Sequence, residues 1–160
     1  MFAALVVSAL LLQSPELTVY VFTTTDCPIS NRYVPEIQRL ATKFAANAKF
    51  VLVYPVPTDT PELIREHKKK FAYSLESVRD TDLELVKSTG AKVTPEVAVM
   101  KGAQLFYRGR IDDRHLDFGK DRQVPTRRDL EDALTALVSG KSVATTRTQA
   151  VGCILSDLVK

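Results

Sequence analysis

Two short runs of β-branched and aromatic residues, separated by a helical stretch, restrict the fold more than any other feature of this 160-residue sequence. Residues 17–24 read LTVYVFTT and residues 49–54 read KFVLVY, which is the composition of buried strands. Between them, residues 28–48 place apolar side chains at helical spacing, with Pro28 suited to the first turn and Pro35 expected to kink the helix. A strand–helix–strand unit of this length favours parallel strands and a right-handed crossover, so we expect an α/β sheet.

The rest of the chain adds helices and a hairpin. Thr60 and Pro61 predict the start of a helix that runs to about Phe71, because threonine is a good cap and proline fits the first turn. The further expected elements are a short helix over 80–88 closed by Gly90, a hairpin of strands 96–101 and 104–108 around Gly102-Ala103, a loop over 109–125, and a final helix over 126–139 capped by Thr126 and ended by Gly140. The hairpin makes the sheet mixed.

Size and charge exclude several classes of protein. The chain is long enough for one ordinary domain and too short for two. With 22 basic and 19 acidic residues, the net charge of +3 gives no general basis for binding nucleic acid through its phosphates. The two cysteines stand at positions 27 and 153, too far apart for a CxxC motif or a four-cysteine zinc site, so each needs its own explanation.

The two ends of the chain are expected to lie outside the domain, which we place at residues 15–140. Within residues 1–14, residues 1–12 are apolar apart from Ser8 but too few to span a bilayer, so we expect no stable membrane span. They read either as a signal peptide that exports the protein to the periplasm or medium, or as an apolar N-terminal helix of a cytoplasmic protein. Residues 141–160 read as an extended tail, which we expect to pack back in part on the domain through Val151, Ile154 and Leu155.

Cys27 is the strongest candidate for a reactive side chain. It lies where a buried strand joins a helix, and a helix N-terminus favours the thiolate, which is the nucleophilic form. Ser30 completes a CxxS motif and can hydrogen-bond the sulfur without being able to resolve a mixed disulfide. The alternative is an inert, buried cysteine, and the carboxylate of Asp26 opposes thiolate formation.

Taken together, these elements resemble the thioredoxin-like superfamily over residues 15–140. Residues 23–40 (TTTDCPISNRYVPEIQRL) and 107–114 (YRGRIDDR) are similar to its redoxin branch, which includes the alkyl hydroperoxide reductase and thiol-specific antioxidant proteins, and the helices within 56–90 resemble that branch's insertion. The resemblance implies a mixed sheet flanked by helices. It also implies that Thr94 faces Cys27 and that Pro95 is cis.

The sequence departs from the family patterns in two places. Ser30 stands where a dithiol thioredoxin has its second cysteine, which excludes a CxxC cycle. The resemblance to peroxiredoxins keeps Thr24 and Cys27 of their motif, but Tyr20 replaces its proline, which weakens the expectation of peroxidase activity. Peroxiredoxins also use an arginine at the thiolate, for which Arg108 and Arg110 are the two candidates.

The segment 108–128 concentrates the basic charge of the chain. Its alternating arginines and aspartates favour surface ion pairs, with binding of a carboxylate or an acidic partner as the alternative. Asp112, Asp113 and His115 supply oxygen and nitrogen ligands, but no spacing fixes them on one face, and neither His67 nor His115 has paired thiolates beside it. We therefore expect no metal site and no cofactor.

These observations predict a thiol redox protein. Cys27 is expected to act as the nucleophile toward a disulfide or a peroxide, with Ser30 and Thr24 hydrogen-bonding its sulfur and an external thiol reductant completing the cycle. The alternative is a non-catalytic module that binds a partner protein or peptide by pairing a strand beside Thr94 and Pro95. Cys153 is the candidate resolving thiol, and Gly152 beside it allows a close backbone approach. A bond to Cys27 would equally serve as a structural clamp, and a tail cysteine that is buried, free or paired with another protein is the other interpretation.

Overall fold

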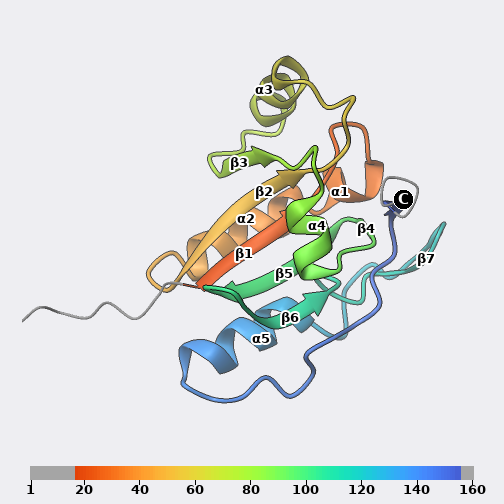
Figure 1. Ribbon diagram of the computed structural model, residues 1–160. Helices are drawn as coiled ribbons and strands as arrows, with labels where there is room; N and C mark the ends of the chain where they lie inside the picture. The colour runs from red at the N-terminus through yellow and green to blue at the C-terminus, as the bar shows by residue number, and fades with distance from the viewer. Residues whose placement is uncertain (1–16, 156–160) are drawn as a thin grey trace, which may run out of the picture.

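The computed structural model describes residues 17–155, so the predicted export segment lies outside the described residues. The core is a five-stranded sheet of order β3-β2-β1-β5-β6 (Figure 1). Its strands are β1 (Leu17–Phe22), β2 (Ala48–Tyr54), β3 (Glu76–Arg79), β5 (Glu96–Lys101) and β6 (Gln104–Gly109). The first three strands are parallel, whereas β5 is antiparallel to both β1 and β6. The predicted mixed α/β sheet is confirmed.

The helical stretch between β1 and β2 is broken, as the proline at position 35 predicts. It forms α1 (Pro28–Arg32) and α2 (Val34–Lys43), with Tyr33 between them. Pro35 has no amide hydrogen and its ring clashes with the preceding turn, so a continuous helix cannot pass through it. The break lets α1 stand at the end of β1 while α2 runs back along the sheet, which sets the position of Cys27 just before α1.

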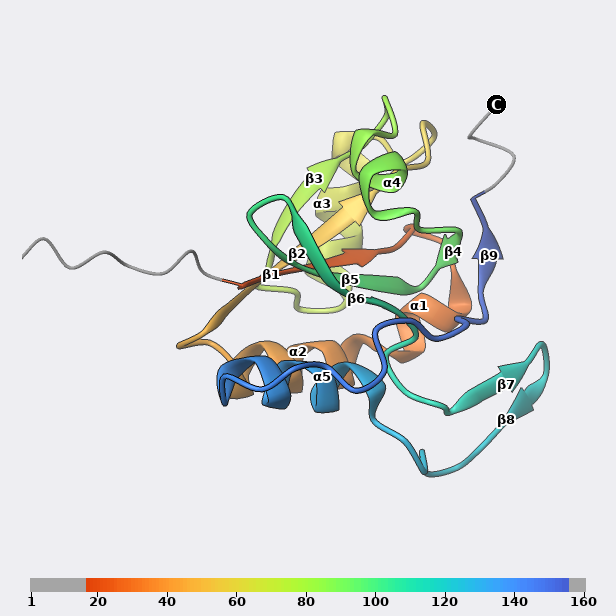
Figure 2. The same ribbon diagram turned by 60° about the horizontal axis from the view of Figure 1, so that its bottom comes forward.

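Helices cover both faces of the sheet. α2 and α5 (Asp129–Val138) lie side by side on one face (Figure 2), where they bury the larger apolar cluster. On the opposite face α4 (Glu84–Thr89) covers a smaller cluster that includes Phe22 and Leu155. α3 (Pro61–Lys70) lies beyond the β3 edge, and Thr60 caps it by accepting a hydrogen bond from the Leu63 amide, as predicted.

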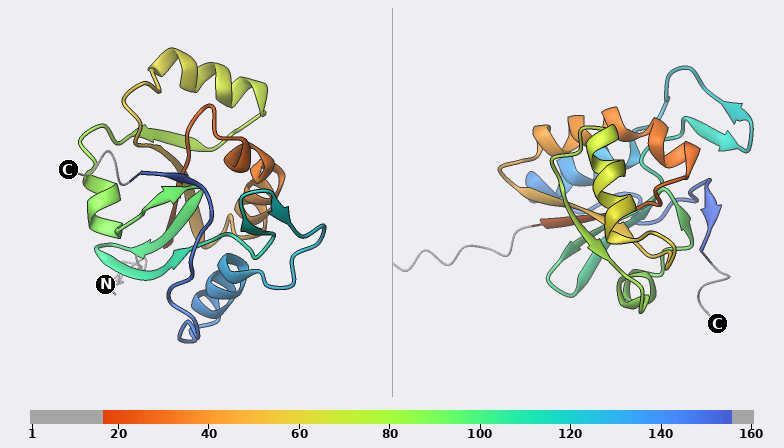
Figure 3. Two further views of the ribbon diagram at one scale, coloured as in Figure 1. Left: turned by 90° about the vertical axis from the view of Figure 1, so that its right-hand side faces the viewer. Right: turned by 90° about the horizontal axis from the view of Figure 1, so that it is seen from above.

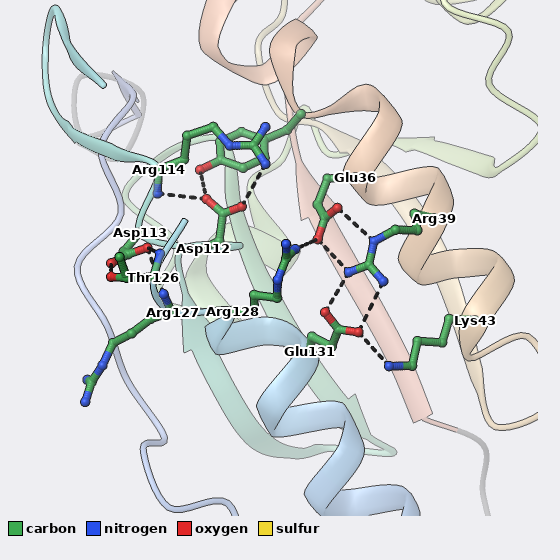
Figure 4. Close-up of polar contacts among 11 residues, drawn as sticks. Glu36, Arg39, Lys43, Asp112, Asp113, Arg114, Thr126, Arg127, Arg128 and Glu131 are labelled. Atoms are coloured by element: carbon green, nitrogen blue, oxygen red, sulfur yellow. Dashed lines mark hydrogen bonds and ion pairs between the residues drawn. The ribbon is translucent and has the colours of Figure 1, made fainter. Parts of the chain in front are cut away.

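A network of charged side chains joins α2 to α5 (Figure 4). Arg39 of α2 contacts Glu36 on its own helix at 2.7 Å and Glu131 of α5 at 2.6 Å. Lys43 also contacts Glu131, and Arg128 contacts Glu36. Because both carboxylates are largely buried and shared between cations, this network holds the two helices together more firmly than isolated surface pairs would.

The final helix begins later than the sequence predicts. Its first residue is Asp129 and its N-cap is Arg128, so the prediction that Thr126 caps it is wrong. The Thr126 hydroxyl and amide instead donate to the carboxylate of Asp113 (Figure 4). A buried carboxylate needs hydrogen-bond donors, and this need competes successfully with the local capping preference of threonine.

Three further regions differ from the predicted boundaries. The helix expected over 80–88 starts only at Glu84, because the Asp80 carboxylate accepts hydrogen bonds from the amides of Leu85 and Val86 and so caps the helix from outside it. β3 was not predicted, since its sequence ESVR is polar and mostly exposed. The expected loop at 109–125 contains a small hairpin, β7 (His115–Asp117) and β8 (Lys120–Asp121).

The tail packs back on the domain, as predicted, and does so as an extended strap (Figure 3). Arg108 of β6 exchanges backbone hydrogen bonds with the tail, donating to Thr146 and accepting from Thr148. Gly109, at φ 152°, allows this approach, because a Cβ there would lie 2.2 Å from the Thr148 hydroxyl. The strap ends as β9 (Cys153–Ile154), antiparallel to β4 (Val93–Thr94).

Candidate functional site

Cys27 occupies the junction that the sequence predicts. It is the N-cap residue of α1, in extended backbone conformation, and Pro28 begins the helix. Its side chain is only 1% exposed. The Thr25 hydroxyl donates to Asp59 at 2.6 Å and so fixes the turn that leads from β1 into this helix. Asp59 comes from the distant loop before α3, and no local sequence signal could have identified it.

The loop before β5 faces the Cys27 sulfur. The Thr94–Pro95 peptide bond is cis, the isomer that the superfamily resemblance implies. The Cys27 thiol donates to the Thr94 carbonyl oxygen at 3.3 Å. The buried oxygens Ser30 Oγ and Thr94 Oγ1 have no hydrogen-bond partner within residues 17–155. Both hydroxyls help to lower the pKa of Cys27, because a thiolate accepts hydrogen bonds more strongly than a thiol does.

Cys153 lies directly against Cys27. The pairing of β9 with β4 places Cys153 opposite Thr94, and the two Sγ atoms are 3.4 Å apart. This distance is longer than the roughly 2.05 Å of a disulfide bond, so both residues are free thiols. Since the Cys27 hydrogen is directed to the Thr94 carbonyl, the Cys153 thiol is the donor of the contact between the sulfurs. Cys153 therefore lies beside Cys27 as a free thiol, and its role as the resolving thiol stays a prediction.

Two residues of the tail hold β9 in this position. Gly152 passes over the Thr94–Pro95 bond so closely that a Cβ would lie 2.1 Å from the Thr94 carbonyl oxygen. Leu155 is 2% exposed, packs in the cluster under α4, and donates its amide hydrogen to the carbonyl of Lys92 at 2.8 Å. Ile154 was expected to dock as well, but it is exposed because strand alternation points it away from Leu155.

The two sulfurs have opposite electrostatic environments. Burial raises the pKa of Cys27, but hydrogen bonds from the side chain and backbone of Ser30, and from Cys153 and Thr94, outweigh this effect and the pKa is lowered. Burial, the contact with Cys27 and the charge of Asp26 together raise the pKa of Cys153 to about 11. Cys27 is therefore the thiolate-forming member of the pair, and Cys153 keeps its proton.

Thr24 does not take the role that the sequence suggests. Its hydroxyl donates to the Asp26 carboxylate at 3.2 Å, and its single hydrogen is therefore not available to the Cys27 sulfur. Asp26 itself is exposed. Its charge raises the pKa of Cys153, whereas we expected it to oppose ionisation of Cys27.

Neither candidate arginine contacts the Cys27 sulfur in the described part of the chain. Arg108 contacts Glu96 and the Gly90 carbonyl, and Arg110 pairs with Asp129 at 2.7 Å. The side chains of Arg108 and Arg110 are mostly buried. The ion pairs that they form therefore stiffen the fold instead of lying on its surface. Such pairing leaves neither guanidinium to bind a peroxide at Cys27.

The residues considered as possible metal ligands hydrogen-bond to different partners. Asp112 accepts from the Tyr33 hydroxyl at 2.6 Å, and Asp113 accepts from Thr126. His115 contacts Asp121 through Nδ1. His67, the other histidine, bonds Tyr54 and Asn31. No group of three or more potential metal ligands gathers among residues 17–155.

The sequence matches no family model and no curated protein. Among solved structures, the fold is similar to an uncharacterised conserved protein of Geobacillus kaustophilus, with a TM-score of 0.76 and 25% identity over 89% of this chain and 77% of that one. It is also similar to a thioredoxin-like protein in the oxidised form, with a TM-score of 0.58 and 16% identity over 79% and 80%. For a secreted Mycobacterium tuberculosis disulfide oxidoreductase, the TM-score is 0.51 and the identity is 15%, over 79% of this chain and 83% of that one. The fold is thioredoxin-like.

Proposed function

We propose that this protein is a thiol–disulfide oxidoreductase whose working couple is Cys27 and Cys153. The observation that carries the proposal is the 3.4 Å contact between a buried thiol of lowered pKa and a thiol of raised pKa. In one direction the two thiols reduce an external disulfide to two thiols and become joined in a disulfide. In the other direction two external thiols reverse the reaction. Each turnover moves two electrons and two protons.

In this proposal the Cys27 thiolate is the nucleophile within the couple, because it attacks Cys153 when Cys153 carries an external sulfur and so closes the Cys27–Cys153 bond. Disulfide exchange proceeds by thiolate attack on a sulfur, and the member with the lowered pKa has the larger thiolate fraction of the two. The hydroxyls of Ser30 and Thr94 stabilise that thiolate, and Pro95 positions the carbonyl of Thr94 beside the sulfur. Cys153 completes the dithiol that Ser30 rules out within the CxxS motif.

The geometry favours disulfides over peroxides as substrates. The resemblance to the redoxin branch implies peroxide reduction, which needs a cation or a donor array to hold the peroxide oxygens. Arg108 and Arg110 are committed to Glu96 and Asp129 instead, and Tyr20 replaces the motif proline. A second thiol already in contact with the first is the arrangement that disulfide exchange requires.

A purely binding role has less support. The binding-module hypothesis needs a free strand edge beside Thr94, but β9 of the same chain occupies that edge. A module that only binds a partner would also not need two thiols in contact. For localisation we propose export, because residues 1–14 resemble a signal peptide and one structural neighbour is a secreted disulfide oxidoreductase.

Non-reducing peptide mapping tests the proposed function. Reduced protein treated with hydroxyethyl disulfide is expected to give a peptide pair joined through Cys27 and Cys153, and to lose that pair after addition of glutathione. The reduction potential of the bond is expected to lie above about −300 mV, the region of labile rather than structural disulfides. Two free thiols after oxidation, or a potential below that value, would contradict a catalytic couple.

A further inference from the structure

The two sulfurs differ in their access to solvent. Cys27 is 1% exposed and lies behind β9, whereas the Cys153 side chain is exposed. The pair thus presents only one sulfur to an incoming molecule. Once the two are joined, a thiolate from outside reaches Cys153 directly and reaches Cys27 only if the tail lifts away.

The exposed sulfur lies on the wall of an apolar cleft of about 270 Å³. The cleft runs between the first turn of α1 and the β7–β8 hairpin, which stands out from the body of the domain near β9 (Figure 2). Its apolar wall comes from Pro28, Ile29 and Phe118. An ion pair of 2.8 Å between Arg32 and Asp121 ties the hairpin to α1 at the rim.

The hairpin presents large apolar side chains to solvent. Phe118 is 64% exposed and Leu116 is 48% exposed, although neither contributes to the buried core of the domain. Exposed apolar groups that gather beside a reactive group are typical of a surface that binds another molecule. The cleft is smaller than the roughly 300–1,000 Å³ of a pocket for a drug-sized ligand, so it fits one apolar side chain of a larger partner.

One polar atom in the wall of the cleft lacks a partner. The Nδ1 atom of His115 contacts the Asp121 carboxylate, which can only accept, so Nδ1 carries the hydrogen and, in the neutral imidazole, Nε2 is an acceptor. His115 Nε2 is buried and has no hydrogen-bond partner within residues 17–155. Leaving a buried acceptor unpaired costs free energy, which a thiol or amide hydrogen from a bound molecule would recover.

We propose that this cleft binds a peptide with an apolar side chain next to its cysteine, and that Cys153 is the sulfur through which the peptide exchanges. The inference rests on the proposed function and names its substrate class. A peptide cysteine supplies the sulfur that Cys153 requires and, through its backbone amide, a hydrogen donor for His115, while the neighbouring side chain fills the apolar wall.

The exchange balances in two steps. The peptide thiolate attacks Cys153 in the oxidised protein, the Cys27–Cys153 bond breaks, and Cys27 leaves as a thiolate while Cys153 becomes joined to the peptide. A second peptide thiolate then attacks the sulfur of the bound peptide, releasing a peptide disulfide and reduced Cys153, which takes up a proton. In the first step, attack at Cys153 is favoured over attack at Cys27, because the lowered pKa of Cys27 makes Cys27 the better leaving group.

Mapping the mixed disulfide decides which sulfur exchanges. Oxidised full-length protein is mixed with the peptide acetyl-Phe-Cys-amide, quenched in acid within a turnover, alkylated and digested. The expected product carries the peptide on Cys153 and the alkyl group on Cys27, and the reverse distribution would overturn the inference. If no Cys27–Cys153 bond forms on oxidation, the proposed function itself fails, which separates the two outcomes.

The rate of reduction by two peptides tests the cleft. Acetyl-Phe-Cys-amide is expected to reduce the oxidised protein about tenfold faster than acetyl-Ser-Cys-amide, since tenfold corresponds to about 1.4 kcal/mol of apolar contact. Phe118→Ala is expected to lower this preference to less than threefold. Val124→Ala, which removes an exposed apolar side chain from the same loop outside the cleft, should retain it. An equal rate for both peptides, or an unchanged preference in Phe118→Ala, would show that the cleft does not select the substrate.

Discussion

The two sides of the redox pair are built in different ways. Cys27 stands at a strand–helix junction whose strand, proline and hydroxyl partner all lie within a few residues of it. Cys153 stands on a two-residue strand at the end of a long strap, held by a glycine and a single buried leucine. The first side is a property of local sequence and the second depends on long-range docking. A substitution that displaces the tail should therefore prevent the Cys27–Cys153 disulfide from forming without unfolding the domain.

The largest effect is expected from removing the second sulfur. Cys153→Ser removes the exposed sulfur and leaves Cys27 without a thiol in contact, so any mixed disulfide that Cys27 forms once the tail lifts must be resolved by a thiol from solution. Because a tethered group acts at an effective concentration of about millimolar or higher, turnover of hydroxyethyl disulfide with glutathione should fall about 100-fold. The thermal unfolding midpoint of the reduced protein should hardly change. Unchanged turnover would show that Cys153 takes no part in the cycle.

Leu155→Ala should release the tail. Leucine-to-alanine changes at buried positions cost about 2–5 kcal/mol, and here the strap absorbs the loss because it is held by few other contacts. We expect faster alkylation of Cys153 and a smaller fraction of the Cys27–Cys153 disulfide at a fixed glutathione ratio. Ile154→Ala is the matched control, since this neighbouring side chain is exposed. Equal behaviour of the two variants would contradict anchoring by Leu155.

Gly152→Ala tests the close passage over the Thr94 carbonyl. The new methyl group would lie 2.1 Å from that oxygen, so β9 must shift away. Overpacking of this kind costs about 1–3 kcal/mol, and the disulfide fraction should fall by less than in Leu155→Ala. Gln149→Ala, at an exposed position of the same strap, should behave as wild type. A wild-type disulfide fraction in Gly152→Ala would show that the register of β9 tolerates a side chain there.

The same contrast explains how much could be predicted from sequence. Local signals were sufficient for β1, the helix break at Pro35, the cap at Thr60 and the hairpin at Gly102, because each depends on neighbours in the chain. Local sequence also indicated Cys27 and Ser30 as a site, and the resemblance to the thioredoxin-like superfamily added the Thr94–Pro95 loop to it. It could not show that Thr126 would donate hydrogen bonds to Asp113 instead of capping a helix, nor that Thr24 would donate to Asp26. Both outcomes depend on which polar group needs a hydrogen-bond donor in the folded state.

The docking of the tail lies at the limit of such prediction. Gly152 and Leu155 were recognisable as residues that allow a close approach and burial. Their target surfaces, the Thr94 carbonyl and the cluster under α4, are assembled only by the whole sheet. The sequence could therefore name Cys153 as a candidate but could not place it 3.4 Å from Cys27.

The pH dependence of alkylation should separate the two thiols in the reduced protein. Cys27 has its pKa lowered by hydrogen bonds, so its iodoacetamide rate should rise at a pH below that of an ordinary thiol and be lost as its thiolate is protonated on acidification. Cys153, with its pKa raised to about 11, should react with a midpoint well above neutral pH. Mass spectrometry of the two peptides at each pH gives both profiles. Two overlapping profiles would remove the asymmetry on which the assignment of the nucleophile rests.

The smallest effect, and the sharpest test of the Cys27 environment, comes from Ser30→Ala. Ser30 lowers the pKa of Cys27 through both its side chain and its backbone amide, and alanine removes only the first. A hydrogen bond to a charged group contributes about 1.5–3 kcal/mol, so the alkylation rate of Cys27 at neutral pH should fall by about tenfold, with the profile moved to higher pH. Thr24→Val is the matched control: it also removes a buried hydroxyl three residues from Cys27 in the chain, but that hydroxyl donates to Asp26 and its loss should leave the Cys27 profile in place. A shift of the Cys27 profile in Thr24→Val with none in Ser30→Ala would mean that the thiolate is stabilised by the Thr24 hydroxyl at the end of β1 and not by the Ser30 hydroxyl.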